Sequence, residues 1–368
     1  MASGFSGLRV NGYRRLKSVD ISPRRLNVLI GANGVGKSSI LDVLHLLGVS
    51  ADRRLAMAVL EKGGLQSILT ADGRTSELRF QVRYQPETAG DINYELTLRE
   101  AGALPVLAID NERLFQSSIG ELLDDAATAP DKNYNRSETA LSQAPPMGKA
   151  SDFRYILAST SAIYHSLDIS ERAPIKSPQR LYPTQAPGAN GEDLLSCLWT
   201  IRETARDNYE AIEDSLRAAF PNFERLEFPP VAAGSFGLGW RDSNFTRPLY
   251  ASELSEGTLR FLWLTTLLQS PGLPMITLID EPEVSLHPEL LRILTELMRE
   301  ASERTQLFVA THSDRFVRFL HPDELIVCDL DESAGMTAQW ADSLDLKEWL
   351  EDYTLDQLWS KGILGGRS

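Results

Sequence analysis

The chain has 368 residues, 42% of them hydrophobic, which is enough to bury a large core as one α/β unit with an inserted lobe. Its 51 aspartates and glutamates outnumber 37 lysines and arginines, and the net charge of −14 excludes nucleic-acid binding through overall charge. Cys197 and Cys328 match no zinc or disulfide spacing, and no uninterrupted apolar run is long enough for a membrane span. We therefore expect a cytoplasmic protein with two buried structural cysteines.

The first residues predict a hairpin and then a strand, a loop and a helix. The hairpin pairs residues 8–10 with 18–21. Leu26–Ile30 is an apolar run bounded by proline and glycine, as in a buried strand. Apolar periodicity over 37–47 predicts the helix that follows a glycine-rich turn.

The middle of the chain changes from strands to helices. Residues 76–109 alternate between polar and apolar and predict three antiparallel strands. Residues 123–150 are rich in Ala, Asp, Asn, Ser and Pro, which predicts a flexible linker. Residues 153–165 and 193–219 have helical periodicity, and 225–249 predicts β structure with turns.

The last third alternates helix and strand, which predicts a mostly parallel sheet. The expected elements are a helix over 256–269, a strand over 275–279, a helix over 288–302, a strand over 306–310, a helix over 313–320 and a strand over 325–328.

Residues 31–38, Gly-Ala-Asn-Gly-Val-Gly-Lys-Ser, fit the P-loop pattern and lie between a predicted strand and a predicted helix. Glycines let backbone N–H groups point at phosphate oxygens, and the helix N-terminus adds a favourable dipole. We expect Lys37 to neutralise the β and γ phosphates and the Ser38 hydroxyl to ligate Mg²⁺. The predicted cofactors are therefore ATP and Mg²⁺. The predicted ATP-binding residues of the loop are Asn33, Gly34, Val35, Gly36, Lys37, Ser38 and Ser39.

Acidic side chains follow the apolar strand over 275–279, and strand ends of such sheets face the ligand crevice. Asp280 is expected to hold Mg²⁺, and Glu281 to polarise the attacking water. His312 follows the next apolar strand, where it would sense the γ-phosphate. We expect Glu281, His312 and Lys37 to be the catalytic residues.

The order of these motifs resembles that of ABC-class ATPases. After the P-loop come LSEGT at 254–258, IDEPE at 279–283, SLHP at 285–288 and THS at 311–313. The chain is similar to the branch that includes RecF, SMC heads and OLD-type ATPases, and looks most like its compact bacterial AAA-family group. The resemblance implies an α/β P-loop fold with a mixed central sheet, an antiparallel β subdomain and an inserted helical lobe.

The resemblance also implies that the chain hydrolyses ATP as a homodimer, with each nucleotide sandwiched between two copies. Ser255, Glu256 and Gly257 would then contact, in trans, the nucleotide bound to the other copy. The resemblance divides the chain into residues 1–122, the first half of the ATPase head; 123–150, a linker and Q-loop region; 151–250, a helical lobe; and 251–368, the second half of the head.

Two further roles implied by the resemblance have several candidate residues. A glutamine should bind Mg²⁺ and sense the γ-phosphate: Gln143 is preferred, with Gln66 and Gln116 as alternatives. A basic residue beyond the P-loop helix should reach phosphate: the candidates are Lys62, Arg53 and Arg54.

The sequence departs from relatives of other function. It lacks a coiled-coil array long enough for SMC-type arms. Ser285 stands where transporter D-loops usually have aspartate, which counts against the alternative of an ABC transporter subunit. His287 either lies at a dimer seam or starts the helix over 288–302. Glu281 counts against a nucleotide binder that does not hydrolyse.

Positive charge is concentrated in the first 25 residues, either as a patch facing DNA or a protein partner or as the solvated edge of the hairpin. The residues are Arg9, Arg14, Arg15, Lys17, Arg24 and Arg25. Tyr13, in the same segment, would either stack on adenine or pack inside the hairpin. The expected function is an ATP-driven switch in DNA repair, genome maintenance or antiphage defence, working through a separately encoded effector and without a membrane partner.

Overall fold

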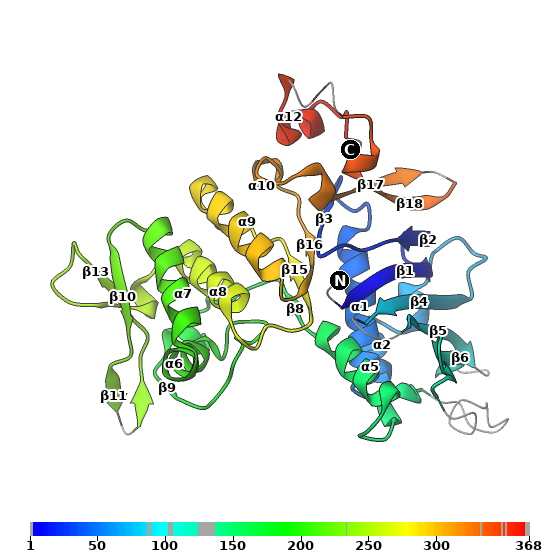
Figure 1. The fold of residues 1–368 in the computed structure, drawn as a ribbon, viewed down its shortest axis with the longest axis horizontal. Helices are drawn as coiled ribbons and strands as arrows, with labels where there is room; N and C mark the ends of the chain where they lie inside the picture. The colour runs from blue at the N-terminus through cyan, green and yellow to red at the C-terminus, as the bar shows by residue number, and fades with distance from the viewer. Residues whose placement is uncertain are drawn as a thin grey trace.

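A computed structural model describes residues 3–86, 90–101, 106–123, 137–232, 234–331, 333–346, 349 and 352–364, and the structural statements below concern these residues. Two six-stranded sheets flank the first long helix, and a smaller lobe of helices and short strands projects to one side (Figure 1). No helix in these ranges is both long and apolar enough to cross a membrane.

The central sheet is mixed, as expected. Its order is β18 (Gly335–Trp340), β17 (Leu325–Asp331), β3 (Leu26–Ile30), β16 (Gln306–Ala310), β15 (Ile276–Asp280) and β8 (Ile163–Tyr164). All neighbours are parallel except β18, which runs antiparallel to β17. The ends of β3, β16 and β15 therefore meet along one edge, where the P-loop, His312 and Asp280 follow.

Apolar side chains on both faces of these strands contribute to two separate cores, because successive side chains of a strand point to opposite faces of the sheet. Leu29 and Phe308 pack with α1 (Lys37–Ala51) in the core shared with the antiparallel sheet. Val28 and Val309 face the other way, toward α8 (Glu256–Gln269) and α9 (Pro288–Ser302). Cys197 and Cys328 are both buried, as predicted.

The antiparallel sheet covers the other side of α1. Its order is β2 (Leu16–Ile21), β1 (Gly4–Tyr13), β4 (Glu77–Gln85), β5 (Ile92–Ala101), β6 (Val106–Gln116) and β7 (Gly120–Glu121). The predicted hairpin and three-stranded segment thus belong to one sheet. The predicted linker falls partly on 124–136, outside the described residues.

Shorter helices pack around this framework. They are α2 (Leu55–Glu61), α3 (Leu65–Ile68), α5 (Lys149–Ala158), α10 (Asp314–Val317) and α12 (Leu355–Ser360). The projecting lobe holds α6 (Leu194–Thr204), α7 (Arg206–Ala219), β9 (Gln179–Arg180), β10 (Phe223–Glu227), β11 (Pro230–Ala232), β12 (Ser235–Phe236), β13 (Gly239–Asp242) and β14 (Leu249–Tyr250).

The structure corrects several predicted boundaries. The helix predicted over 193–219 is two helices, because Ala205 leaves helical geometry at φ −142° and lets α7 turn back on α6. The helix predicted over 153–165 ends early, and Ile163–Tyr164 instead pairs with β15 as strand β8. The helix predicted over 313–320 is only α10. The expected division at residues 122, 150 and 250 stays a prediction.

Gly48 marks the close approach of α1 to residues 159–161. A Cβ atom there would lie 2.4 Å from the Ser161 nitrogen and 2.6 Å from the Thr160 carbonyl carbon. Alanine improves helix propensity by about 1 kcal/mol, but this clash is with backbone and overpacking costs about 1–3 kcal/mol. We expect Gly48→Ala to lower the melting temperature by several degrees. Gly64→Ala, where a Cβ meets nothing but φ is 87°, is a control that isolates backbone strain.

Candidate nucleotide-binding site

The P-loop leaves the end of β3 and opens α1 without a side-chain cap. Within the described part of the chain, no side chain accepts a hydrogen bond from the first N–H groups of α1, and no acidic residue lies in its first turn. Gly36 adopts φ 126°, and a Cβ there would lie 3.0 Å from Met336 Sδ, so this position requires glycine. Uncapped N–H groups and the helix dipole make this end of α1 suited to phosphate.

Lys37 is almost fully buried inside the loop. Its Nζ donates to the carbonyl oxygens of Gly31 at 2.7 Å and Ala32 at 2.9 Å, and lies 3.1 Å from Nδ1 of His312. Burial lowers the pKa of Lys37 to about 8, since desolvation disfavours the charged form. An anion in the loop would raise this pKa again and stabilise the ammonium form.

Ser38 and Asp280 meet across the ends of β3 and β15. Ser38 Oγ donates to Asp280 Oδ1 at 3.4 Å, and His165 Nδ1 lies 3.6 Å from Asp280 Oδ2. Burial raises the pKa of Asp280, so a cation beside it would stabilise the ionised carboxylate. A hydroxyl and a carboxylate are oxygen ligands that suit Mg²⁺, and the pair fits the predicted metal site.

Glu281 is held in an unusual backbone conformation. Its φ is 49°, a left-handed geometry that costs a residue with a Cβ about 1–2 kcal/mol. Its N–H donates to Ala310 O at 2.8 Å, and its own carbonyl accepts from Arg260 at 2.7 Å. The side chain is partly exposed, and its Oε1 lies 3.5 Å from His312 Nε2. The backbone is fixed while the carboxylate faces the open site.

His312 connects the P-loop with the acidic strand end. Because Lys37 donates to Nδ1, the hydrogen-bond network assigns the ring proton to Nε2, which faces Glu281. Burial, with help from the Lys37 charge, lowers the pKa of His312 and favours this neutral form. His312 therefore lies between Lys37 and Glu281, the other two residues predicted as catalytic.

The nucleotide pocket has a volume of about 250 Å³ and includes basic residues that the sequence prediction did not place there. Its lining consists of Arg14, Arg15, Gly34, Gly36, Lys37, Ser38, Ser39 and His312. Asn33 is exposed at the loop, and Val35 is buried beneath it. The positive φ of Arg14, 46°, marks the tight β1–β2 turn that brings both arginines to the pocket.

None of the three glutamines considered lines this pocket. Gln143 is exposed in the turn Leu141–Gln143, whose Ser142 carbonyl accepts from Arg53 just past the far end of α1. Gln66 donates to Glu100, and Gln116 to Gly90 O. Because α1 separates Gln143 from the P-loop by about 20 Å at 1.5 Å per residue, the structure does not bring it to Ser38 and Asp280. His165, at the end of β8, takes the place beside Asp280.

The basic residues predicted beyond α1 are also engaged elsewhere. Lys62 pairs with Asp42 at 2.9 Å, Arg54 pairs with Asp52 at 3.3 Å, and Arg53 bonds Ser142 O. Lys62 is thus close to α1, where it shares the carboxylate of Asp42, one turn beyond Ser38, with Arg14. None of the three lines the pocket.

The LSEGT segment opens α8, away from its own P-loop. Ser255 caps the helix by accepting from Thr258 N at 3.1 Å, and both Ser255 and Glu256 are exposed. Glu256 accepts from Ser285 Oγ at 2.6 Å, and a Cβ on Gly257 would lie 2.4 Å from Ser285 O. His287, for which two roles were considered, caps α9 by accepting from Glu289 N.

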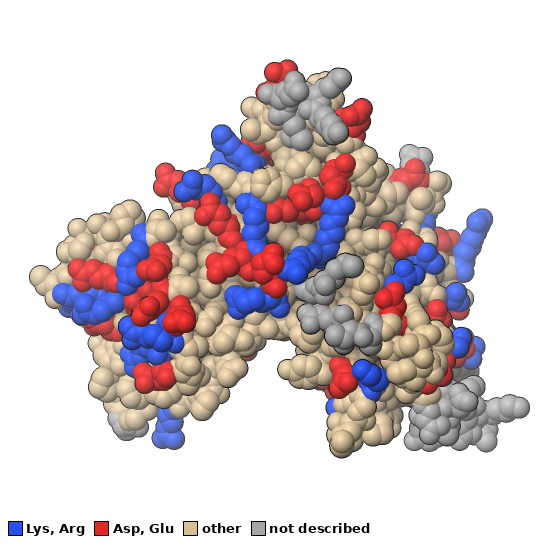
Figure 2. All heavy atoms as spheres, in the orientation of Figure 1, with Lys and Arg blue, Asp and Glu red and all other residues tan. Residues whose placement is uncertain are grey.

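The basic start of the chain is largely neutralised by acids. Its ion pairs are Arg9 with Asp20, Arg14 with Asp42, Arg24 with Asp342 and Arg25 with Glu303. On the face shown in Figure 2, Lys and Arg alternate with Asp and Glu. Tyr13 is fully buried with its hydroxyl 3.2 Å from Asp42, so it packs inside the fold and no base can stack on it.

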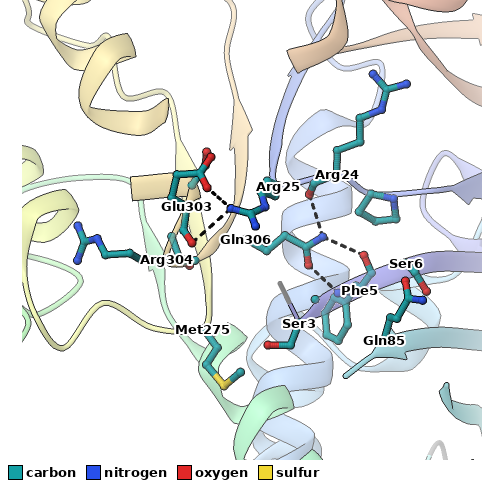
Figure 3. A pocket seen from close by; sticks show the side chains of 14 residues that line it. Ser3, Phe5, Ser6, Arg24, Arg25, Gln85, Met275, Glu303, Arg304 and Gln306 are labelled. Carbon is teal, nitrogen blue, oxygen red and sulfur yellow. Dashed lines mark hydrogen bonds and ion pairs between the residues drawn. The ribbon is translucent and has the colours of Figure 1, made fainter. Parts of the chain in front are cut away.

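A second cavity of about 450 Å³ opens at the opposite end of the central sheet (Figure 3). Two of its polar side chains already have partners: Gln306 bonds both backbone groups of Phe5, and Arg304 donates to the carbonyls of Leu268 and Ser270. Arg25 pairs with Glu303 there. Among the described residues, the three arginines that line this cavity, Arg24, Arg25 and Arg304, thus all have hydrogen-bond or ion-pair partners.

A family profile described as "AAA domain, putative AbiEii toxin, Type IV TA system" matches residues 26–318, most of the chain. The chain belongs to this AAA_21 family. The match spans the P-loop, the LSEGT segment, the acidic strand end and His312. Together with the RecF and SMC-head similarities given next, it confirms the predicted kinship with the RecF and SMC branch.

Curated relatives match over shorter stretches. The chain is similar to "DNA replication and repair protein RecF" of Pseudomonas savastanoi pv. phaseolicola, with 48% identity over 51 residues, 14% of this chain and 14% of that protein. The RecF of Pseudomonas fluorescens strain SBW25 is 46% identical over 132 residues, 31% of this chain and 35% of that protein. The AAA_21 chain therefore spans about a third or less of the length of these relatives.

Two solved structures share the fold of the AAA_21 chain. The SMC head bound to the C-winged helix domain of ScpA covers 91% of this chain and 97% of its own, with a TM-score of 0.59 and 14% identity. The SMC head with an extended coiled coil, bound to the C-terminal domain of ScpA from Pyrococcus furiosus, covers 95% and 99%, with a TM-score of 0.58 and 12% identity. The predicted ATPase-head fold is confirmed.

Proposed function

We propose that this AAA_21-family protein binds ATP with Mg²⁺ and hydrolyses it at a site that a second copy completes. One observation carries the proposal: Lys37, Ser38, Asp280, Glu281 and His312 come from distant parts of the chain and meet at the ends of β3, β15 and β16. This is the constellation that phosphoryl transfer to water requires.

Each residue has a chemical role in this proposal. The N–H groups of α1 and the Lys37 ammonium bind phosphate oxygens. Ser38 and Asp280 would hold Mg²⁺, which would neutralise phosphate charge when bound. Glu281 orients the attacking water and accepts its proton, while the Nε2–H of His312 donates toward the γ-phosphate. Arg14 and Arg15 add positive charge at the pocket wall.

The homodimer belongs to the same proposal. Ser255, Glu256 and Gly257 are exposed or half-exposed and do not line their own nucleotide pocket, so they are free to contact nucleotide bound to another copy. Mass measurement with and without ATP, and with and without duplex DNA, tests dimer closure and DNA binding together. ATP should roughly double the mass.

The biological output that we propose is an ATP-driven switch in DNA repair and genome maintenance or in antiphage defence, acting through a separately encoded effector. The similarity to RecF supports a link to DNA repair. The paired arginines of the first 25 residues give no support to DNA contact through that segment.

Replacing Lys37 tests nucleotide binding directly. Lys37→Ala removes the buried cation from the loop, and loss of two charge-assisted hydrogen bonds at about 1.5–3 kcal/mol each should weaken ATP binding by about 100-fold or more. The measurement is titration with a fluorescent ATP analogue. Lys149→Ala, at an exposed lysine on α5, is the control and should bind as the wild type does. Equal affinity for both variants would contradict the P-loop assignment.

A further inference from the structure

Arg260 is a buried arginine on the helix that begins with the LSEGT segment. It lies on α8, five residues after Ser255, and only 3% of its surface is exposed. Its Nη2 donates to two carbonyl oxygens, those of Glu281 and His165, each at 2.7 Å. Arg260 thereby joins α8 to the ends of β15 and β8, where the water-orienting residue and the neighbour of Asp280 lie.

Two polar groups of opposite charge are left unpaired in this region. Among the described residues, Arg260 Nε and Glu283 Oε2 are both buried and neither has a hydrogen-bond partner. Buried groups without partners are rare in folded proteins, and charged ones are the least favourable. Of the acidic side chains that act on the Arg260 charge, Glu283 is the strongest, followed by Glu256 and Glu281. A donor and an acceptor suited to each other thus lie in one buried region without bonding.

The other carboxylate oxygen of Glu283, Oε1, is hydrogen-bonded to the segment that carries His312. Its Oε1 accepts from Thr311 Oγ1 at 2.6 Å and from the N–H of His312 at 3.2 Å. A bond between Arg260 and Glu283 would therefore complete a continuous connection from the LSEGT helix to His312.

The loop that carries Glu283 is strained at both ends. Glu281 has φ 49° and Ser285 has φ 62°, both left-handed values for residues with a Cβ. Ser285 is also the residue whose side chain bonds Glu256 and whose carbonyl packs on Gly257. A force on the start of α8 is thus transmitted to this loop through direct contacts, and strained backbone at such sites favours rearrangement.

We propose that Arg260 and Glu283 form a switchable ion pair, open in the conformation described here and closed when the LSEGT segment engages nucleotide on the partner copy. Closing satisfies both unpaired groups, and it links the occupancy of the partner's site to the position of Glu281 and His312 in this copy. Arg260 and Glu283 are positioning residues, since neither touches nucleotide. The inference rests on the proposed ATPase function and names a regulation of that site.

A double-mutant cycle on ATP hydrolysis tests the pair. Arg260→Met and Glu283→Gln keep approximate size and remove one charge each. We expect each to lower kcat by about tenfold while KM for ATP changes less than about twofold, and the double variant to be no slower than the slower single variant. Arg260→Lys, which keeps the charge, should recover part of the rate. Losses in kcat that multiply in the double variant, or an unchanged kcat for Glu283→Gln, would overturn the proposal.

A matched control separates the pair from general loss of stability. Arg299 on α9 forms a closed, partly buried ion pair with Glu324 at 2.5 Å, remote from the site. Arg299→Met should lower the melting temperature and leave kcat unchanged. If the wild type hydrolyses ATP but the losses in kcat of the two single variants multiply in the double variant, only the proposed ion pair is contradicted. If the wild type hydrolyses no ATP at all, the proposed function fails and the pair fails with it.

Discussion

Replacing Glu281 with glutamine is expected to lower the ATPase rate by about 100-fold or more, the usual contribution of a general base. Glutamine has the same shape but cannot accept a proton from water. The strained backbone of residue 281 should be kept, because its N–H bonds Ala310 O and its carbonyl bonds Arg260 whatever the side chain is. Phosphate release at saturating ATP measures the effect.

Nucleotide binding should survive in Glu281→Gln, because the contacts of the phosphates come from the P-loop. The variant should therefore accumulate ATP-bound dimers, which in the wild type are short-lived because hydrolysis opens them. Mass measurement in the presence of ATP should detect these dimers. Glu289→Gln is the control, since Glu289 is an exposed acid on the first turn of α9. Equal turnover by Glu281→Gln and wild type would show that Glu281 is not the base.

The sequence predicted those parts of the site whose signals are local. The P-loop and the acidic strand end each combine a buried apolar strand with reactive residues within a few positions, and β3 and α9 match their predicted bounds. Strand ends of a parallel sheet meet at one edge, so the meeting of Lys37, Asp280 and His312 could be expected before any coordinates.

The rest of the site depends on contacts between segments that no short motif records. His165 reaches Asp280 only because a two-residue strand, β8, pairs with β15 across more than a hundred positions of chain. Arg14 and Arg15 reach the pocket because they lie in the tight β1–β2 turn. In the sequence, the same two residues are equally compatible with a solvated hairpin edge. Gln143 was predicted from its place in the order of motifs, but the chain returns to the far end of α1 at that point.

Some predicted helix lengths were wrong for a related reason. Residues 193–219 have continuous amphipathic periodicity, yet they form α6 and α7, which contact each other and bury their apolar faces in one core. Periodicity measures the faces of a helix and carries no information on where it bends. The position of Arg260 could not be predicted for the same reason. A charged side chain is usually exposed, but tertiary packing buries this one.

Mixing two inactive variants is expected to restore hydrolysis if the site is shared between copies. Lys37→Ala removes nucleotide binding from its own pocket. Ser255→Arg places a bulky cation at the exposed start of α8, where we expect contact with the partner's nucleotide, and losing the cap should cost about 1 kcal/mol of stability. Each variant alone should retain about 1% or less of the wild-type rate, since it lacks one half of every site.

In an equimolar mixture, half of the dimers combine the two variants, and each mixed dimer holds one intact site built from the Ser255→Arg P-loop and the Lys37→Ala signature segment. The mixture should therefore recover about a quarter of the wild-type rate, because an isologous two-fold dimer uses the same two surfaces in both sites. Premixed chains refolded together guard against slow exchange of copies. A Ser255→Arg protein that keeps the full rate alone would show that each copy hydrolyses ATP by itself. A mixture of folded variants that dimerises without recovering activity would contradict a site built from one P-loop and the other copy's signature segment.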